Sequence, residues 1–95
     1  LTGKVTGKQQ GSMKKGKREG KWKFYYNDNV LKAKGTYKKG KQDGSFTIYH
    51  DNSRILYQGN YLKGKKEGQF NFYYKDGKIN KKKSGIYKNG EKISD

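Results

Sequence analysis

The residues that could do chemistry gather in short runs of glycine, lysine and aromatic side chains, of which GKREGKWKFYY at residues 16–26 is the first. Glycines next to a lysine suggest a phosphate-binding loop, whereas basic and aromatic side chains together suggest a nucleic-acid surface. A Walker-type loop requires G-x-x-x-x-G-K-[ST] between a strand and a helix. Here the spacing is different and no helical pattern follows, so the run is better explained as a structural unit that recurs along the chain.

Acid-base and metal chemistry have few candidate side chains. His50 is the only histidine and there is no cysteine, so a metal site would lack nitrogen and sulfur ligands. Asp51 and Asp76 could serve as a general acid and a general base. Both lie in predicted turns, as do Asp28 and Asn52, where short polar side chains bond to the backbone. We therefore predict no enzyme activity, no catalytic residue and no cofactor, and we interpret His50 as a packing residue.

The composition describes a small and strongly basic chain. Its 95 residues include 24 Lys and Arg against 8 Asp and Glu, which gives a net charge of +16. Nine Tyr, four Phe and one Trp supply most of a core, while 14 Gly and no Pro suit tight turns between uninterrupted strands. No apolar run is long enough to span a membrane. The chain does not begin with Met, which suggests a processed or trimmed product, and its compartment (cytoplasmic, or exported and membrane-peripheral) stays open.

The chain repeats with a period of 24 residues. GKWKFYYNDN from Gly20, GSFTIYHDNS from Gly44 and GQFNFYYKDG from Gly68 align column by column. The alignment gives one domain over 1–95, with a half repeat at 1–19, repeats at 20–43, 44–67 and 68–90, and a tail at 91–95. Two extra residues near KINKKK interrupt the third repeat. The structural columns are Trp22, Phe46 and Phe70; Phe24, Ile48 and Phe72; Gly35, Gly59 and Gly85; and Tyr37, Tyr61 and Tyr87.

Each repeat predicts a β-hairpin, because apolar and polar side chains alternate on both sides of a short turn. Pairing Tyr26 with Leu31 places Trp22 opposite Gly35, so that the large ring covers a residue without a side chain. The GKxxG segments between repeats predict tight turns, whose acidic residues bond turn amides. The predicted fold is all-β: an elongated antiparallel sheet of tandem hairpins, in which seven strands would span roughly 30 Å.

The repeated pattern G-x-W-x-x-Y-Y-x-[ND]-G-x-L…G-x-Y-x-x-G-K-x-[DE]-G resembles the MORN repeat over about residues 11–90. The resemblance is strongest to the bacterial variant found in proteins called YwqK-type antitoxins. It implies an elongated hairpin array used for binding, with phospholipids and partner proteins as proposed ligands. MORN repeats also occur in plant phosphatidylinositol-phosphate kinases, so a kinase name for such a chain would reflect the repeats alone. Departures from the pattern are Asn29 and Ser53 in place of the turn glycine, and His50 in place of a tyrosine.

Two surfaces are candidate binding sites. Stacking of the repeats aligns the basic residues of the inter-repeat turns along one edge, which would attract an anionic phospholipid surface. A tyrosine column on the face opposite the core suits a protein partner; Lys23, Thr47 and Asn71 lie beside it, and Leu56 and Ile86 share that face. Each has a structural alternative, since lysines blunt sheet edges and cross-strand tyrosines stabilise ladders. The basic edge comprises Lys14, Lys15, Lys17, Arg18, Lys38, Lys39, Lys41, Lys63, Lys65 and Lys66, and the partner face comprises Tyr25, Tyr49 and Tyr73.

The sequence therefore favours a non-catalytic binding or scaffold module that recognises a protein partner or an anionic phospholipid surface. One alternative is an antitoxin-like protein that binds a single partner protein. Another is a basic nucleic-acid-binding protein, for which charge is the only evidence and binding would be nonspecific. The terminal strands would also leave open edges, through which chains could associate edge to edge.

Overall fold

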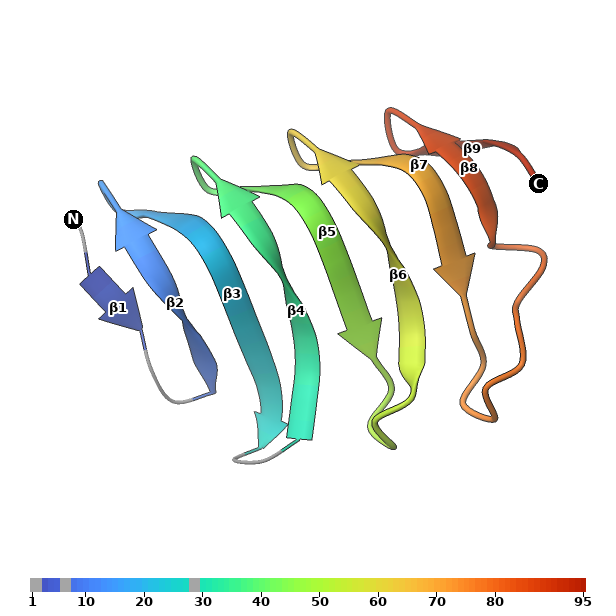
Figure 1. The fold of residues 1–95 in the computed structure, drawn as a ribbon, viewed down its shortest axis with the longest axis horizontal. Coiled ribbons are helices and arrows are strands. Elements are labelled where there is room, and N and C mark those ends of the chain that lie inside the picture. The colour runs from blue at the N-terminus through green and yellow to red at the C-terminus, as the bar shows by residue number, and fades with distance from the viewer. Residues whose placement is uncertain (1–2, 6–7, 28–29) are drawn as a thin grey trace.

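In the computed structural model, which describes residues 3–5, 8–27 and 30–95, the chain forms one open antiparallel sheet (Figure 1). Within these residues there are nine strands and no helix. Each strand pairs with the next one along the chain, and the molecule measures 41 × 30 × 12 Å. The strands are β1 (Gly3–Val5), β2 (Gln9–Lys14), β3 (Lys17–Asn27), β4 (Val30–Lys38), β5 (Lys41–Tyr49), β6 (Ile55–Leu62), β7 (Lys65–Phe72), β8 (Gly85–Lys88) and β9 (Glu91–Ser94).

This architecture confirms the predicted all-β array of tandem hairpins, but with two strands more than predicted. The leading half repeat contains both β1 and β2, and residues 91–95, predicted as a tail, contain β9. The last strand forms because Asn89 and Gly90 adopt φ of 53° and 88°, the left-handed conformations of a two-residue hairpin turn. The chain thus turns back after β8 in the same way as it does between the repeats.

The predicted register holds at the centre of each hairpin and fails near its loop. The pairs Trp22–Gly35, Phe46–Gly59 and Phe70–Gly85 are all present. The predicted pairing of Tyr26 with Leu31 is wrong, because a bulge shifts the register after Phe24 and Leu31 pairs with Tyr25. A bulge adds one residue to one strand and reverses the faces beyond it, so Leu31 lies on the face opposite Phe24.

The large rings do cover glycines, but the glycines belong to the preceding hairpin. A Cβ atom on Gly59 would lie 2.6 Å from ring atoms of Phe70, and one on Gly35 would collide with the ring of Phe46. The prediction that each ring covers its partner within the hairpin is therefore wrong. At Gly85 a Cβ atom would instead meet the C-terminal strand, 2.6 Å from Lys92 Cε. Each glycine consequently lets one repeat pack closely on the next.

The core is a row of aromatic rings on one face of the sheet, which we call the aromatic face. Trp22, Phe46 and Phe70 are only 1%, 3% and 0% exposed. Tyrosines lie between them in edge-to-face contact, with ring centroids 5.6 Å apart for Phe46–Tyr61 and 5.5 Å for Tyr61–Phe70. Such pairs contribute about 1 kcal/mol each beyond the area they bury. Since every ring contacts the next repeat, the repeats stabilise one another as in other arrays.

Long side chains cover the aromatic face, because the sheet has no second layer above it. The guanidinium of Arg18 lies 4.9 Å from the Trp22 ring centroid, and Lys66 Nζ lies 5.8 Å from that of Tyr61. Their stems cover the rings and their charged ends lie over the ring faces, with Arg18 Nε buried and without a hydrogen-bond partner among the described residues. These covering side chains belong to one column of the repeat, which consists of Arg18, Gln42, Lys66 and Lys92 and pairs with Met13, Tyr37, Tyr61 and Tyr87.

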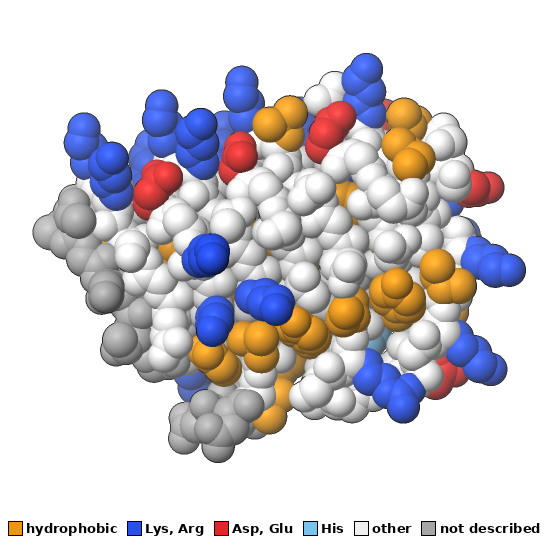
Figure 2. All heavy atoms as spheres, viewed as in Figure 1, with side chains coloured by type: hydrophobic (Ala, Val, Ile, Leu, Met, Phe, Trp, Pro, Cys, Tyr) orange, Lys and Arg blue, Asp and Glu red, His pale blue; other side chains and the backbone are white. Residues whose placement is uncertain are grey.

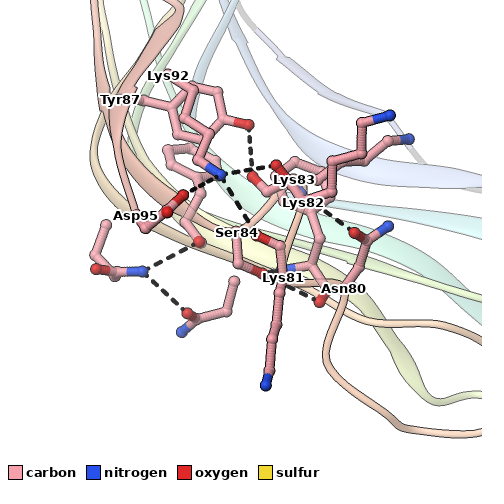
Figure 3. A network of polar contacts seen from close by, with 12 residues as sticks. Asn80, Lys81, Lys82, Lys83, Ser84, Tyr87, Lys92 and Asp95 are labelled. Atoms are coloured by element: carbon pink, nitrogen blue, oxygen red, sulfur yellow. Dashed lines mark hydrogen bonds and ion pairs between the residues drawn. The ribbon is translucent and has the colours of Figure 1, made fainter.

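The two extra residues of the third repeat lie in the hairpin loop between β7 and β8, as predicted, and this loop is fastened to the sheet (Figure 3). Lys92 Nζ donates to the carbonyl oxygens of Lys82 at 2.7 Å and Lys81 at 3.4 Å. The Tyr87 hydroxyl donates to the carbonyl oxygen of Lys83 at 2.6 Å. The loop is thus held from both β8 and β9, while its five lysine side chains are exposed.

Candidate functional site

The turns between repeats lie side by side along one edge of the sheet (Figure 1). Each is built on a lysine or asparagine followed by glycine at positive φ, for example 53° at Lys39 and 85° at Gly40. This conformation matches the twist of the two strands and directs the turn side chains into water. Figure 2 shows basic side chains along this edge. We call the following eight exposed residues the lysine edge: Lys14, Lys15, Lys17, Lys38, Lys39, Lys41, Lys63 and Lys65.

The acidic residues beside the lysine edge are engaged by backbone amides. Glu19 Oε1 accepts a hydrogen bond from the Lys39 amide at 3.0 Å, Asp43 Oδ2 accepts one from the Lys63 amide at 3.2 Å, and Glu67 repeats this contact. These bonds confirm that the acidic residues cap turns, and the turn in each case is that of the following repeat. In the described part of the chain, no residue of the lysine edge forms an ion pair, so its charge is free to attract an external anion.

Two shallow hollows lie between successive turns of this edge. The first, of about 430 Å³, is lined by Lys14, Lys15, Lys17, Glu19, Lys38 and Lys39. The second, of about 470 Å³, is lined by Lys17, Lys38, Lys39, Lys41, Asp43, Leu62 and Lys63. Five lysines thus line the first hollow together with one glutamate, whose carboxylate already accepts a hydrogen bond from a backbone amide. Such a site suits an anion with several oxygens, because ammonium groups donate strong charge-assisted hydrogen bonds to phosphate.

Arg18 and Lys66, predicted as members of the basic edge, lie on the aromatic face instead. They alternate with Lys17 and Lys65 along β3 and β7, so their side chains point to the other side of the sheet. Arg18 Nη2 donates to Gln9 Oε1 at 2.7 Å. The column that contains them replaces the charge by Gln42 in the second repeat, a sign in the sequence that the position does not require a cation.

The predicted tyrosines lie on the face opposite the aromatic face, which is the face seen in Figure 2. The register pairs each with an aliphatic residue, giving Tyr25–Leu31, Tyr49–Ile55 and Tyr73–Ile79. Figure 2 shows hydrophobic side chains gathered in one line across this face. Of the two aliphatic residues predicted on this face, Ile86 pairs with Gln69 on the same face but away from this line, and Leu56 falls at a bulge. We call Tyr25, Leu31, Tyr49, Ile55, Tyr73 and Ile79 the tyrosine row.

Comparison with known families identifies the repeating unit. Residues 18–39 and residues 66–89 each match the MORN repeat variant. These two segments are similar to MORN repeats. Each matched segment corresponds to one hairpin of the sheet, β3 with β4 and β7 with β8. No curated protein matches the sequence.

The hairpin between the two matched MORN repeats, β5 with β6, has the same geometry. Phe46 pairs with Gly59, and Phe46 packs against Gly35 of the hairpin before it. The Asp43 carboxylate caps the next turn as Glu19 does one repeat earlier. The three hairpins therefore form one continuous MORN-type array, with the lysine edge at its inter-repeat turns.

Beside the tyrosine row lies a patch of uncharged polar side chains, of which the sequence predicted only Thr47 and Asn71 as neighbours of the tyrosines. Ser45, Thr47, Gln58, Asn60, Gln69 and Asn71 line a hollow of about 220 Å³ between β5, β6 and β7. We call these six residues the amide patch. The first MORN repeat holds Lys21, Lys23 and Lys34 in three of the same columns. The change from lysine in the first repeat to uncharged polar residues in the later repeats is the feature of the sequence that indicates the patch.

His50 and the tyrosine column it belongs to connect neighbouring repeats. His50 Nε2 lies 2.9 Å from the carbonyl oxygen of Tyr73, and one repeat earlier the Tyr26 hydroxyl donates to that of Tyr49 at 2.8 Å. Histidine therefore replaces tyrosine with the same hydrogen bond. In the described part of the chain, no group of three or more His, Cys, Asp or Glu side chains could hold a metal ion.

The two aspartates weighed as an acid-base pair make turn contacts. Asp51 Oδ1 forms an ion pair with Lys75 Nζ at 3.1 Å, and Asp76 Oδ1 accepts from the Lys78 amide at 2.9 Å. Asp28 lies outside the described residues. No helix in the described residues is long and apolar enough to cross a membrane.

Proposed function

We propose that this chain is a non-catalytic binding module that docks its lysine edge on an anionic phospholipid surface. The observation that carries the proposal is the line of eight exposed lysines, beside which the carboxylates are occupied by turn amides. A straight edge meets a flat surface at several repeats at once. Each lysine near an anionic leaflet contributes about 1 kcal/mol, so four lysines in contact would strengthen binding roughly a thousandfold.

The hollows of the edge favour a headgroup with several phosphate groups over a uniformly charged surface. Five lysines from two successive turns line the first hollow. A phosphoinositide headgroup concentrates its charge in phosphate groups on one ring, whereas phosphatidylserine carries a single net charge. We therefore expect a preference for phosphoinositides that exceeds what equal surface charge would give.

Liposome co-sedimentation tests this proposal. Phosphoinositide vesicles are compared with phosphatidylserine vesicles of equal surface charge, at low and at physiological salt. A triple variant with glutamate at Lys38, Lys39 and Lys41 should lose binding to both. The matched control makes the same charge change at Lys78, Lys81 and Lys82, which belong to the β7–β8 loop, and should bind almost normally. Equal binding by both variants, or binding that disappears at physiological salt for both lipids, would mean that the +16 net charge acts without a site.

A protein partner is the second candidate, favoured by the apolar tyrosine row. Five of its six side chains are half-buried and Ile79 is 44% exposed, so a partner that covers the row would bury further apolar area. This candidate includes an antitoxin-like protein that binds one protein ligand. A complex held by the row would survive moderate salt in a pull-down, whereas nucleic acid bound by charge alone would be released.

A further inference from the structure

The amide patch is an uncharged area on a chain in which a third of the residues are charged. Its six side chains come from three consecutive strands and lie on one face, because Ser45 pairs with Asn60 and Gln58 pairs with both Thr47 and Asn71. Four of them are exposed and two are half-buried. Figure 2 shows that the middle of this face, away from the basic side chains, carries neither charge nor hydrophobic groups. A surface of this kind has no electrostatic attraction for lipids or nucleic acids.

The chemistry of the patch suits a ligand with many hydroxyl groups. An exposed amide offers two N–H donors and one carbonyl acceptor in a plane, and serine and threonine hydroxyls both donate and accept. Gln69 Nε2 donates to Asn71 Oδ1 at 3.2 Å, which orients the Asn71 amide with its own N–H groups available. Adjacent hydroxyls of a sugar ring present donors and acceptors with complementary spacing. The strand face of the partly open OB-fold barrel, for example, binds oligosaccharides.

The tyrosine row supplies the other half of a sugar-binding surface. Tyr49 and Tyr73 border the patch and are half-buried, and an aromatic ring with a polar end packs well against the C–H groups of a sugar. Equivalent residues of successive repeats are two strands apart, about 9.6 Å. This spacing is close to the length of one disaccharide in an extended β-1,4-linked glycan. A linear glycan running across the strands would therefore meet equivalent polar side chains twice, first at Ser45 and Thr47 of β5 and then at Gln69 and Asn71 of β7.

We propose that the amide patch and the adjoining part of the tyrosine row bind a neutral, extended β-1,4-linked glycan. The site is separate from the lysine edge, so this inference does not depend on membrane binding. It competes with the protein partner for the tyrosine row. The amide patch distinguishes the two ligands. A protein bound through apolar contacts would not need the patch, whereas the hydroxyl groups of a sugar would form hydrogen bonds with it.

The test is a titration of the ¹⁵N-labelled protein with cellohexaose and chitohexaose, followed by NMR, with maltohexaose as the α-linked control. The side-chain amides of Gln58, Asn60 and Asn71 should shift with a β-linked hexasaccharide and not with maltohexaose. The affinity should be the same at low and at high salt, because the ligand is neutral. Absence of shifts at the patch with both β-linked sugars, or equal shifts with maltohexaose, would overturn the proposal.

A variant pair assigns the binding to the patch. Gln58→Lys with Asn71→Lys places at these positions the residues that the first repeat already uses, Lys34 and Lys23, so the fold should be retained. Loss of two hydrogen-bonding amides should weaken binding at least about tenfold. The triple glutamate variant of the lysine edge should bind the sugar normally. If the two variants bind the sugar equally well, the sugar is bound elsewhere and the inference is wrong.

Discussion

Replacing Gly59 by alanine tests whether the ring-over-glycine contact determines how the repeats pack. The new Cβ atom would lie 2.6 Å from three atoms of the Phe70 ring, about 1 Å inside ordinary van der Waals contact. The ring has no free direction in which to move, because Phe70 is 0% exposed and its centroid lies 5.5 Å from Tyr61 and 5.4 Å from Tyr87. Overpacking of this kind costs about 3 kcal/mol.

The opposing effect on the unfolded chain is smaller. Alanine reduces the backbone freedom of the unfolded state relative to glycine, which stabilises the fold by about 0.4–1 kcal/mol. The net free energy of unfolding should therefore fall by about 2 kcal/mol, which for a domain of this size lowers the melting temperature by roughly 8–16 °C. The measurement is urea and thermal unfolding followed by circular dichroism.

Two controls make this prediction specific. Gln58→Ala changes the neighbouring residue of β6, which is exposed on the opposite face, and should alter stability by less than about 0.5 kcal/mol. Phe70→Leu should cost less in the Gly59→Ala background than in the wild type, because the smaller side chain relieves the overlap. A Gly59→Ala variant within 0.5 kcal/mol of wild type, or strict additivity of the two changes, would refute the packing argument.

Three further predictions concern side chains on or next to the aromatic face. Arg18→Ala should cost about 1–2 kcal/mol and shift Trp22 fluorescence to the red, since it uncovers the ring, whereas Lys17→Ala should do neither. Burial and the Tyr57 hydrogen bond raise the pKa of Tyr61 above 10.0. Because the folded state holds this proton more tightly than the unfolded state, the free energy of unfolding should be constant below about pH 10 and fall above it. The fall should be less steep in the Tyr61→Phe variant. Lys92→Met should speed hydrogen exchange in the β7–β8 loop without changing exchange in β5.

Much of the fold follows from the sequence because two patterns occur in it together, the 24-residue repeat and the two-residue alternation of β-strands. Alternation gives the strands, and the repeat of the alternation fixes which rings share a face, so the Trp22, Phe46 and Phe70 column could be identified without coordinates. The bulge after Phe24 could not, because the sequence admits Tyr26–Leu31 and Tyr25–Leu31 pairing equally well. With the observed register, the Tyr26 hydroxyl donates to the Tyr49 carbonyl oxygen of the next repeat, a contact that pairing within one hairpin does not reveal.

The lysine edge shows the same division between local and long-range information. The turns and their exposed lysines follow from the short GKxxG pattern alone, and so does the location of Glu19 beside them. That Glu19 caps the following turn, at Lys39, depends on how two repeats stack. The location of Arg18 is equally sensitive to its position in β3. A shift of one residue along the strand would move its side chain from the aromatic face to the edge.

One column of the repeat shows how a basic sheet without a second layer can bury its core. Arg18, Gln42, Lys66 and Lys92 each lie across from the column of Met13, Tyr37, Tyr61 and Tyr87. What these four share is a long flexible stem, and two of them lie over aromatic rings within 6 Å of the centroid. Length is thus what the position requires, and the charged ends of Arg18 and Lys66 add a cation–π contact with the rings that they cover. Arg18→Met should consequently preserve most of the stability that Arg18→Ala loses, and a methionine variant as unstable as the alanine variant would show that the cation itself is required.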